Sequence, residues 1–498
     1  MSAVWPHLPI LQVVLPLIGA IVAAFLRRPA SAYALTLLVS WTLPILSGAM
    51  LWQALNQGPI SYHIGGWEPP WGIEYRVDVF NAFVLALISV VAAVIMPAAR
   101  RTIGLEIEAD RQPRFWCIFL LCLTGLLGIV VTGDAFNAFV FLEIASLSTY
   151  VLIALGPDRR ALLAAYRYLI VGTVGATFYV IGVGLLYLVT GTLNMADMAA
   201  RIGPAWPEQS RTVVAALGFI TVGIGLKLAL FPLHAWLPNA YTYAPSWVTV
   251  FLSATATKAA IYLLVRFYFS VFGAAIAVQD LPFSTLVIAL SVAAMFLASL
   301  SAAFEPNLKR MLAYSSVAQI GYITLGIGLQ NQAGLTGGIV HIANHALMKA
   351  ALFLAAAAIL LRMRTVHIAD LAGAGRTMPW TMAAFSVAGL GLIGTPGTSG
   401  FVSKWYLVLG AIDKGWWPLA FLIVASSLIS LIYVGRVLEI AWMRRPGEAA
   451  GAATDPPASI LAPLLLLAAA TVYFGIDPRL TAGIADQAAE ALLSGAMR

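Results

Sequence analysis

Charged residues are scarce in this chain. Of its 498 residues, 10% are charged and 61% are hydrophobic, whereas about 25% of the residues of a soluble globular protein are charged. The mean hydropathy is +0.91. This composition excludes a large soluble domain and predicts a polytopic membrane protein that lies in a lipid bilayer.

Cysteine is nearly absent as well. Cys117 and Cys122 lie in one apolar run, and their spacing matches no metal motif, so we expect small core residues. We expect no metal and no cofactor, because the chain has no cysteine cluster and no glycine-rich phosphate loop. The net charge of +7 does not indicate a nucleic-acid partner, because most basic residues lie in short loops between apolar runs.

Long apolar runs are abundant instead. A bilayer core of about 30 Å needs roughly 20 apolar residues, and fourteen runs qualify, the first of which we interpret as a transmembrane helix rather than a removed signal peptide. The runs are 8–26, 31–55, 77–98, 114–132, 134–155, 163–190, 211–241, 245–270, 282–303, 307–330, 333–361, 379–412, 416–443 and 458–475. The predicted fold class is therefore all-α, with an outer hairpin loop at 56–76 and an amphipathic helix at 480–498.

Basic residues alternate between the loops. With the N-terminus outside, the inside segments hold 16 of the 28 basic residues, Lys309 among them, and the outside segments hold seven, Arg266 among them. The positive-inside rule then places both termini on the outer face. The remaining five lie inside spans and are Lys227, Lys258, Lys349, Lys404 and Arg436.

Ionisable groups at this depth are candidates for function, because a lysine at the bilayer centre costs about 2.5–3.5 kcal/mol. Glu143 is the one carboxylate that lies clearly at mid-span, and it is the expected partner of Lys227. Arg436 has Glu439 three residues further along the same helix face, which predicts a structural ion pair.

Two spans are interrupted. The stretch 223–241, GIGLKLALFPLHAWLPNAY, carries Lys227, Pro232 and Pro238, and the stretch 389–405, GLGLIGTPGTSGFVSKW, carries Pro396 and Lys404. Each proline removes one helical hydrogen bond. A single helix of this kind is also compatible with a kink and a snorkelling lysine, but two breaks in corresponding places predict a transporter built of repeats.

The spacing of the breaks supports the repeats. Pro232 follows the start of the fourth span by 118 residues (232 − 114), and Pro396 follows the start of the ninth by 114 (396 − 282). We therefore expect two inverted five-helix repeats, since five crossings reverse the orientation. The expected domains are 1–113 with three helices and the outer hairpin loop, 114–270 and 282–443 as repeats, and 444–498 with the fourteenth helix and the tail.

The buried groups suit proton movement. His341, His345 and Lys349 are spaced four and four, which places them on one helix face. Burial disfavours a charged lysine and a nearby carboxylate favours it, while histidine titrates near neutral pH. A row of such groups, joined by water, can pass protons singly.

Each of these groups also has a structural interpretation. Glu143 and Lys227 can be a structural ion pair, and His341 and His345 can be satisfied core histidines. His234 can bond backbone that the first break frees, and Lys349 can neutralise a partner.

At these residues the sequence resembles the antiporter-like, proton-conducting membrane subunits shared by Mrp-type multisubunit cation/proton antiporters and respiratory complex I. The segments that carry the resemblance are FLEIASLSTYVLIAL around Glu143, GLKLALFPLHAWLPNAY, LKRMLAYSSVAQIGY, HIANHALMKAALF and GTPGTSGFVSKW. It covers nearly the whole chain. It implies fourteen helices, two inverted repeats, outer termini, a bacterial-type inner membrane and other membrane subunits as partners.

The resemblance also implies a proton path. Its members use the glutamate of the fifth helix, the lysines of the seventh, eighth and twelfth, and a histidine of the eleventh. The corresponding residues here are Glu143, Lys227, Lys258, Lys404 and His341.

Three features bear on the type of member. Lys404 stands where some members carry glutamate, and the chain ends soon after its fourteenth span. Asn239 and Tyr241 stand where many complex I relatives have Asp and His. These features favour the D type of Mrp membrane component.

Three functions follow as hypotheses. The first is a proton-translocating subunit of an antiporter for Na⁺ or K⁺. The alternative is a pumping subunit of a complex I-like NADH-quinone oxidoreductase or membrane-bound hydrogenase, with the redox chemistry in partner chains. The third is a structural subunit with a silent axis, that is, a row of buried ionisable groups that moves no protons.

Overall fold

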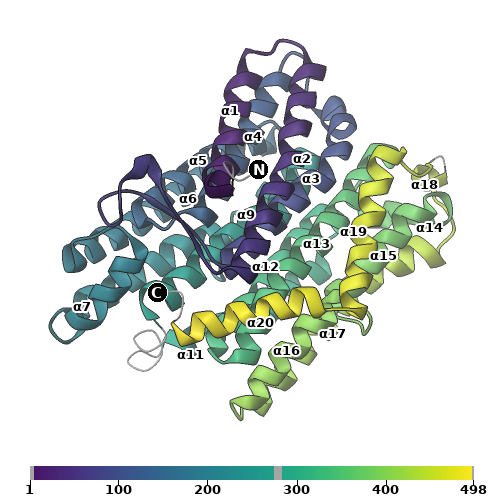
Figure 1. Cartoon of the computed structure of the whole chain (residues 1–498). Helices are drawn as coiled ribbons and strands as arrows, with labels where there is room; N and C mark the ends of the chain where they lie inside the picture. The colour runs from purple at the N-terminus through teal and green to yellow at the C-terminus, as the bar shows by residue number, and fades with distance from the viewer. Residues whose placement is uncertain (1–4, 274–282, 452, 496–498) are drawn as a thin grey trace.

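The chain folds almost entirely into helices, most of which run side by side (Figure 1). A computed structural model describes residues 5–273, 283–451 and 453–495. Residue 282, where we expected the ninth span to begin, and residues 496–498 of the tail lie outside this described part. Helices dominate because backbone groups in lipid must bond within the protein.

Within the described residues, thirteen helices are long and apolar enough to cross a membrane. The full-length helices are α1 (Leu8–Phe25), α2 (Pro29–Asn56), α3 (Val79–Glu106), α4 (Gln112–Val131), α5 (Ala135–Ala154), α6 (Arg160–Thr190), α7 (Met195–Leu228), α9 (Ser246–Val265), α11 (Phe283–Phe304), α12 (Leu308–Leu329), α13 (Gln332–Met363), α17 (Trp417–Met443) and α19 (Ala458–Ile476). The helices α15 (Pro379–Ile393) and α16 (Ser399–Asp413) supply a fourteenth crossing in two pieces, so the predicted fourteen is confirmed (13 + 1).

Short elements complete the fold. They are η1 (Trp5–His7), η2 (Ile64–Gly66), α8 (Leu237–Tyr243), the π-helical η3 (Arg266–Val271), η4 (Ile368–Leu371), α14 (Ala374–Thr377), α18 (Glu448–Gly451) and α20 (Arg479–Ser494). The predicted amphipathic tail is α20, which runs across the bundle and packs against α13 and α3 (Figure 1).

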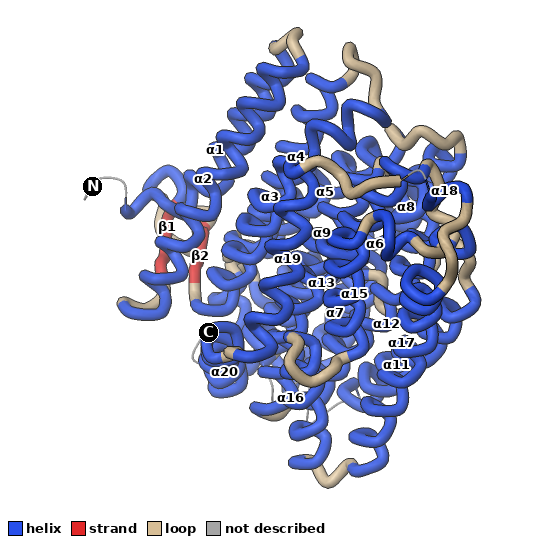
Figure 2. Tube along the Cα trace, turned by 90° about the vertical axis from the view of Figure 1, so that its right-hand side faces the viewer, coloured by secondary structure: helices blue, strands red, loops and turns tan. Residues whose placement is uncertain are grey.

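The hairpin that we expected within 56–76 is present in the structure. Its strands β1 (Ile60–His63) and β2 (Glu74–Val77) pair antiparallel, with Ile60 opposite Val77. Figure 2 shows the hairpin at one edge of the molecule beside α1 and α2.

Short polar side chains start several of the spans. Asp78, Asp134, Asn194, Asn307 and Asn331 each precede a helix and accept a hydrogen bond from a backbone N–H of its first turn. Such N-caps satisfy donors that the helix itself leaves unpaired. They explain why α3, α5, α7, α12 and α13 begin where they do.

The seventh helix begins earlier than we expected. It starts at Met195 rather than at 211, because the segment with Pro204 and Pro207 is helical too and joins the rest at a kink at Gln209. The prediction placed the start of the span at this kink.

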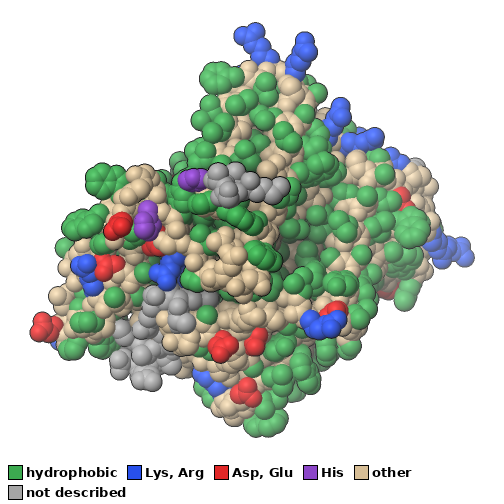
Figure 3. Space-filling model, in the orientation of Figure 1, with side chains coloured by type: hydrophobic (Ala, Val, Ile, Leu, Met, Phe, Trp, Pro, Cys, Tyr) green, Lys and Arg blue, Asp and Glu red, His purple; other side chains and the backbone are tan. Residues whose placement is uncertain are grey.

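Four of the buried ionisable groups, Lys258, His341, His345 and Lys349, lie on the innermost helices. In the most apolar stretch of α9 with η3, 94% of the residues are buried, and the corresponding values are 94% for α12 and 83% for α13. By contrast, α2, α6 and α17 expose large apolar side chains such as Ile45, Leu188 and Phe421, and green covers most of the molecule in Figure 3. Cys122 is buried, whereas Cys117 is only half-buried.

Candidate functional site: a row of buried ionisable side chains

The first break places Lys227 in the last turn of α7. The helix ends at Leu228, because Ala229 adopts a left-handed conformation (φ 62°). The indole of Trp236 donates to the freed carbonyl of Leu226 at 2.8 Å, and its ring stacks on Tyr168 at 3.6 Å between centroids. The break is therefore stabilised by specific contacts.

Lys227 and Glu143 meet inside the protein. Lys227 Nζ lies 3.7 Å from Glu143 Oε1 and donates to Ser146 Oγ at 2.5 Å and to Tyr150 OH at 3.3 Å. A close charge-assisted bond measures about 2.7–2.9 Å, so this pair is in contact without being locked. The lysine side chain is 4% exposed, which rules out snorkelling, and the glutamate side chain is 27% exposed.

Beside Lys227 lies a cavity of about 30 Å³ that is also lined by Tyr168 and by Ala256 and Ala260 of α9. This volume has room for a water molecule. The cavity thus extends from Lys227 toward the helix that carries Lys258.

Lys258 is fully buried in the middle of α9. Its ammonium group donates to the carbonyl of Ser253 at 2.5 Å and to Thr257 Oγ at 3.3 Å. Within the described residues, neither it nor Lys349 nor Lys404 forms an ion pair with a carboxylate.

The helix α13 presents its three groups on one face, as the spacing predicts. The rings of His341 and His345 lie parallel with centroids 6.2 Å apart. His341 bonds Ser403 Oγ at 2.7 Å and Gln319 Oε1 at 2.8 Å. His345 is fully buried, and neither of its ring nitrogens has a partner among the described residues. Unpaired buried nitrogens of this kind call for bound water.

Lys349 lies at the C-terminal end of this face. It donates to the carbonyl of Leu312 at 2.9 Å and to Ser315 Oγ at 2.5 Å. The helix α13 packs against α9, which carries Lys258, and against α16, which carries Ser403 and Lys404. The three groups of α13 thus lie on a helix between those of Lys258 and Lys404.

The second break is closed by its own lysine. The helix α15 ends at Ile393 because Gly394 has a φ of 91°. Lys404 donates to the carbonyls of Leu392 at 3.1 Å and Ile393 at 2.8 Å, where a cation is favoured by the negative end of the helix dipole. A Cβ on Gly394 would lie 2.9 Å from Lys404 Cδ, so a side chain here would also displace Lys404.

His234 does not join the row. It is half-buried in the first break, where its ring stacks on Phe231 with centroids 5.1 Å apart. Its Nδ1 has no partner in the described part of the chain. The structure therefore pairs Glu143 with Lys227 and places Lys258 on a helix that packs against the helix of His341, His345 and Lys349. His341 bonds Ser403, the neighbour of Lys404. These seven side chains form the row, and His234 lies aside in the first break.

One sequence prediction about a cation within a span is wrong. Arg436 does not pair with Glu439; it donates to the carbonyl of Glu305, while Glu439 pairs with Arg444 at 3.0 Å. The carboxylate of Glu439 thus pairs with the arginine five residues after it rather than with the one three residues before it.

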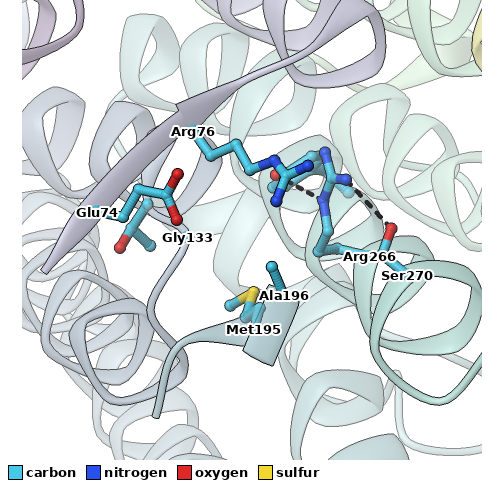
Figure 4. A pocket seen from close by; sticks show the side chains of 9 residues that line it. Glu74, Arg76, Gly133, Met195, Ala196, Arg266 and Ser270 are labelled. Carbon is cyan, nitrogen blue, oxygen red and sulfur yellow. Dashed lines mark hydrogen bonds between the residues drawn. The ribbon is translucent and has the colours of Figure 1, made fainter. Parts of the chain in front are cut away.

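Sequence reasoning also missed a buried ion pair at the C-terminal end of α9. Arg266, which we counted only as an outside charge at the end of its span, lies 2.6 Å from Asp78, and both side chains are 8% exposed. Figure 4 shows Arg266 bonded to Ser270 and close to Arg76, with Glu74 across a cavity of about 20 Å³. The spacing of Lys258, Tyr262, Arg266 and Ser270 at four-residue intervals was the available signal.

This ion pair gives a stability prediction. We expect Asp78→Asn to lower the midpoint of thermal unfolding of the purified complex, because it leaves a buried arginine without its counter-charge, a loss of about 3–5 kcal/mol. Asparagine still caps α3. Asp134→Asn, another N-cap without an arginine partner, is the matched control, and an equal shift in both variants would show that the pair adds nothing.

Comparison with known proteins identifies this architecture. Residues 132–430 match the family described as NADH:quinone oxidoreductase/Mrp antiporter, TM. The chain belongs to this family. It is a multi-pass membrane protein of the transporter type, with the broken seventh and twelfth helices that the sequence predicts.

Relatives of two kinds are similar to this family member. It is 41% identical over 489 residues to the N-type subunit of NADH-quinone oxidoreductase from Desulforudis audaxviator, covering 94% of this chain and 96% of the relative. It is 30% identical over 478 residues to the D-type component of the Na⁺/H⁺ antiporter from Alkalihalophilus pseudofirmus, covering 94% of each.

Solved structures show the same pattern. A chain of the Mrp complex from Dietzia sp. DQ12-45-1b superimposes with a TM-score of 0.89 at 27% identity and 98% coverage of both chains. A chain of the membrane-bound sulfane sulfur reductase, an archaeal respiratory membrane complex, reaches a TM-score of 0.89 at 30% identity and 97% coverage of both.

Proposed function

We propose that this chain is the proton-translocating subunit of a multisubunit antiporter that exchanges protons for Na⁺ or K⁺. The observation that carries the proposal is the row itself: Lys227, Lys258, His341 and Lys404 are buried, and Glu143 lies beside Lys227. A water-sized cavity adjoins Lys227, and the ring nitrogens of His345 have no partner among the described residues. His345 and Lys349 complete the row on α13. A purely structural role explains such a row poorly, because buried charges contribute little net stability.

Protons move along this row by changes of electrostatic partner. An approaching carboxylate stabilises the ammonium form of a buried lysine, and its withdrawal releases the proton. The loose 3.7 Å contact between Glu143 and Lys227 leaves room for such a change. At the first helix break Lys227 contacts a hydroxyl group, and at the second break Lys404 contacts a backbone carbonyl.

The partly exposed Glu143 supports assembly with other membrane subunits. Its side chain is 27% exposed on a helix that would otherwise meet lipid, and an ionised carboxylate in hydrocarbon is costly. A neighbouring subunit that covers this face removes the cost. The similar chains of the Mrp complex and of the sulfane sulfur reductase also belong to multisubunit assemblies.

The proposed orientation puts both termini on the outer face of a bacterial-type inner membrane, with repeats at 114–270 and 282–443. Basic side chains crowd the upper and right-hand edges of the molecule in Figure 3, whereas acidic ones gather along its lower and left-hand parts. The positive-inside rule assigns the basic edge to the inside.

The alternative is a pumping subunit of a complex I-like NADH-quinone oxidoreductase or membrane-bound hydrogenase. The 41% identity to an N-type subunit of NADH-quinone oxidoreductase favours it. In that case the same row moves protons, and partner chains supply the driving reaction.

Complementation tests the proposal. We expect the whole operon to restore growth of a salt-sensitive, antiporter-deficient bacterium in Na⁺ or K⁺, and its membrane vesicles to exchange protons for the cation without an electron donor. Proton flux that needs an electron donor instead of a salt gradient would establish the redox alternative. Growth without proton flux dependent on this subunit would favour a silent axis.

A further inference from the structure

Two charged side chains outside the row hold the turn between α8 and α9. Glu106, the last residue of α3, accepts hydrogen bonds from Ser246 N–H and Ser246 Oγ, each at 2.6 Å. Lys309, in the first turn of α12, donates to the carbonyl of Ala244 at 2.9 Å and is 4% exposed. This turn lies at the inner end of the broken seventh span.

A cavity lies on one side of this arrangement. Glu106 lines it together with Thr102, Pro157 and Arg364, and its volume is about 200 Å³. A water molecule occupies about 30 Å³ in the liquid, so the cavity has room for several. The carboxylate thus faces this cavity on one side and the buried N-terminus of α9 on the other.

The other side leads toward the row. Lys309 interacts electrostatically with Glu106. On α12 it shares a face with Leu312 and Ser316, at spacings of three and seven residues. Lys349, the inner end of the row, is bonded to the carbonyl of Leu312 and to the neighbouring Ser315. Glu106 thus lines the cavity, Lys309 bonds the same turn as Glu106, and Lys349 bonds the second turn of α12, the helix that carries Lys309.

We propose that Glu106 and Lys309 form the inner mouth of the proton path. Glu106 exchanges a proton with water in the cavity. The O–H bond of the protonated carboxyl breaks as an N–H bond forms on the neutral amine of Lys309, and the proton then passes through bound water to Lys349. The same steps run in reverse for outward delivery, and no electron changes hands. This inference rests on the proposed proton path.

A cap-only role makes a different prediction. A carboxylate at the N-terminus of α9 and an ammonium at the C-terminus of α8 both suit the helix dipoles. If capping is their whole role, substitutions that keep the caps leave transport intact.

Two such substitutions exist. Glu106→Gln keeps the shape and both hydrogen bonds, because the Ser246 hydroxyl can accept from the new amide, but removes the exchangeable proton. Lys309→Arg keeps a charged donor that cannot be deprotonated. We expect each to lower cation-driven proton flux about tenfold or more in everted membrane vesicles that contain the whole complex.

The matched control is Glu108→Gln. Glu108 lies two residues further along and pairs with Arg111 at 3.1 Å on the surface, so we expect normal flux. The solvent isotope effect on flux should rise in Glu106→Gln, because proton exchange at the mouth becomes rate-limiting. All rates are divided by the amount of assembled complex.

These outcomes distinguish the proposed inner mouth from the proposed proton path. Normal flux in Glu106→Gln, or a loss without a larger isotope effect, would overturn the inner mouth. Glu143→Gln is measured beside it: loss there with normal flux in Glu106→Gln refutes only the mouth, whereas normal flux in both refutes the proposed function.

Discussion

We expect replacement of Lys227 by alanine to abolish cation-dependent proton flux, and replacement of Glu143 by alanine to do the same, while the complex still assembles. We expect a loss of about a hundredfold or more, the lower end of what a positioned proton-transfer group contributes. Lys227 lies between Glu143 at 3.7 Å, Ser146 and a cavity that extends toward α9. Without its amine, the path from Glu143 to Lys258 lacks a proton carrier.

A conservative pair of variants separates transport from packing. Lys227→Gln keeps a donor for Ser146, and Glu143→Gln keeps the size of the side chain, but neither retains a titratable group. Flux is measured in everted vesicles from the decay of a pH gradient after addition of Na⁺ or K⁺. Normal exchange in both glutamine variants would refute the assignment of these residues to a proton path and favour a purely structural subunit.

Replacement of Lys404 by alanine is expected to cause a similarly large loss. Its Nζ bonds the last carbonyls of α15 and Ser427, and the adjacent Ser403 bonds His341. The alanine variant also leaves those carbonyls unpaired, which costs about 1–3 kcal/mol of stability. A loss of flux in this variant alone therefore has two explanations.

The variant Lys404→Arg distinguishes between these two explanations, a lost proton carrier and a lost cap. Arginine keeps the positive cap on α15 but does not release a proton. If Lys404 carries protons, the arginine variant is stable and inactive, which thermal unfolding and flux measurements on the same preparation will show. Normal exchange in Lys404→Arg would assign the residue a capping role, and unchanged exchange in Lys404→Ala would confine the path to the first half of the chain.

Hydropathy and helical spacing were sufficient for much of the fold and of the site. The fourteen crossings, both breaks and the shared face of His341, His345 and Lys349 follow from short-range patterns. The pairing of Glu143 with Lys227 was expected for another reason, because Glu143 is the one carboxylate clearly at mid-span. These features are predictable because a bilayer requires long apolar helices, and because each proline or lysine within an apolar run is an evident exception to that requirement.

Loop assignments were less secure. Counting charges assigned Arg266 and Lys309 only to a side of the membrane, and the structure shows both buried at helix ends, one against Asp78 and the other against the carbonyl of Ala244. A count of loop charges registers a residue's side of the membrane but not its depth. Arg436 is a similar case, because several partners lay within reach of its long side chain and sequence spacing alone selected the wrong one.

By itself, the sequence determined the membrane architecture, the two interrupted spans and the residue types available for proton movement. Only the tertiary structure decided which of those residues meet. It placed His234 outside the row, gave Lys404 the carbonyls of its own break, and brought Glu106 and Lys309 to one turn. The physical reason is that periodicity is a property of one helix, whereas contacts between α3, α9, α12 and α13 depend on how separate helices pack.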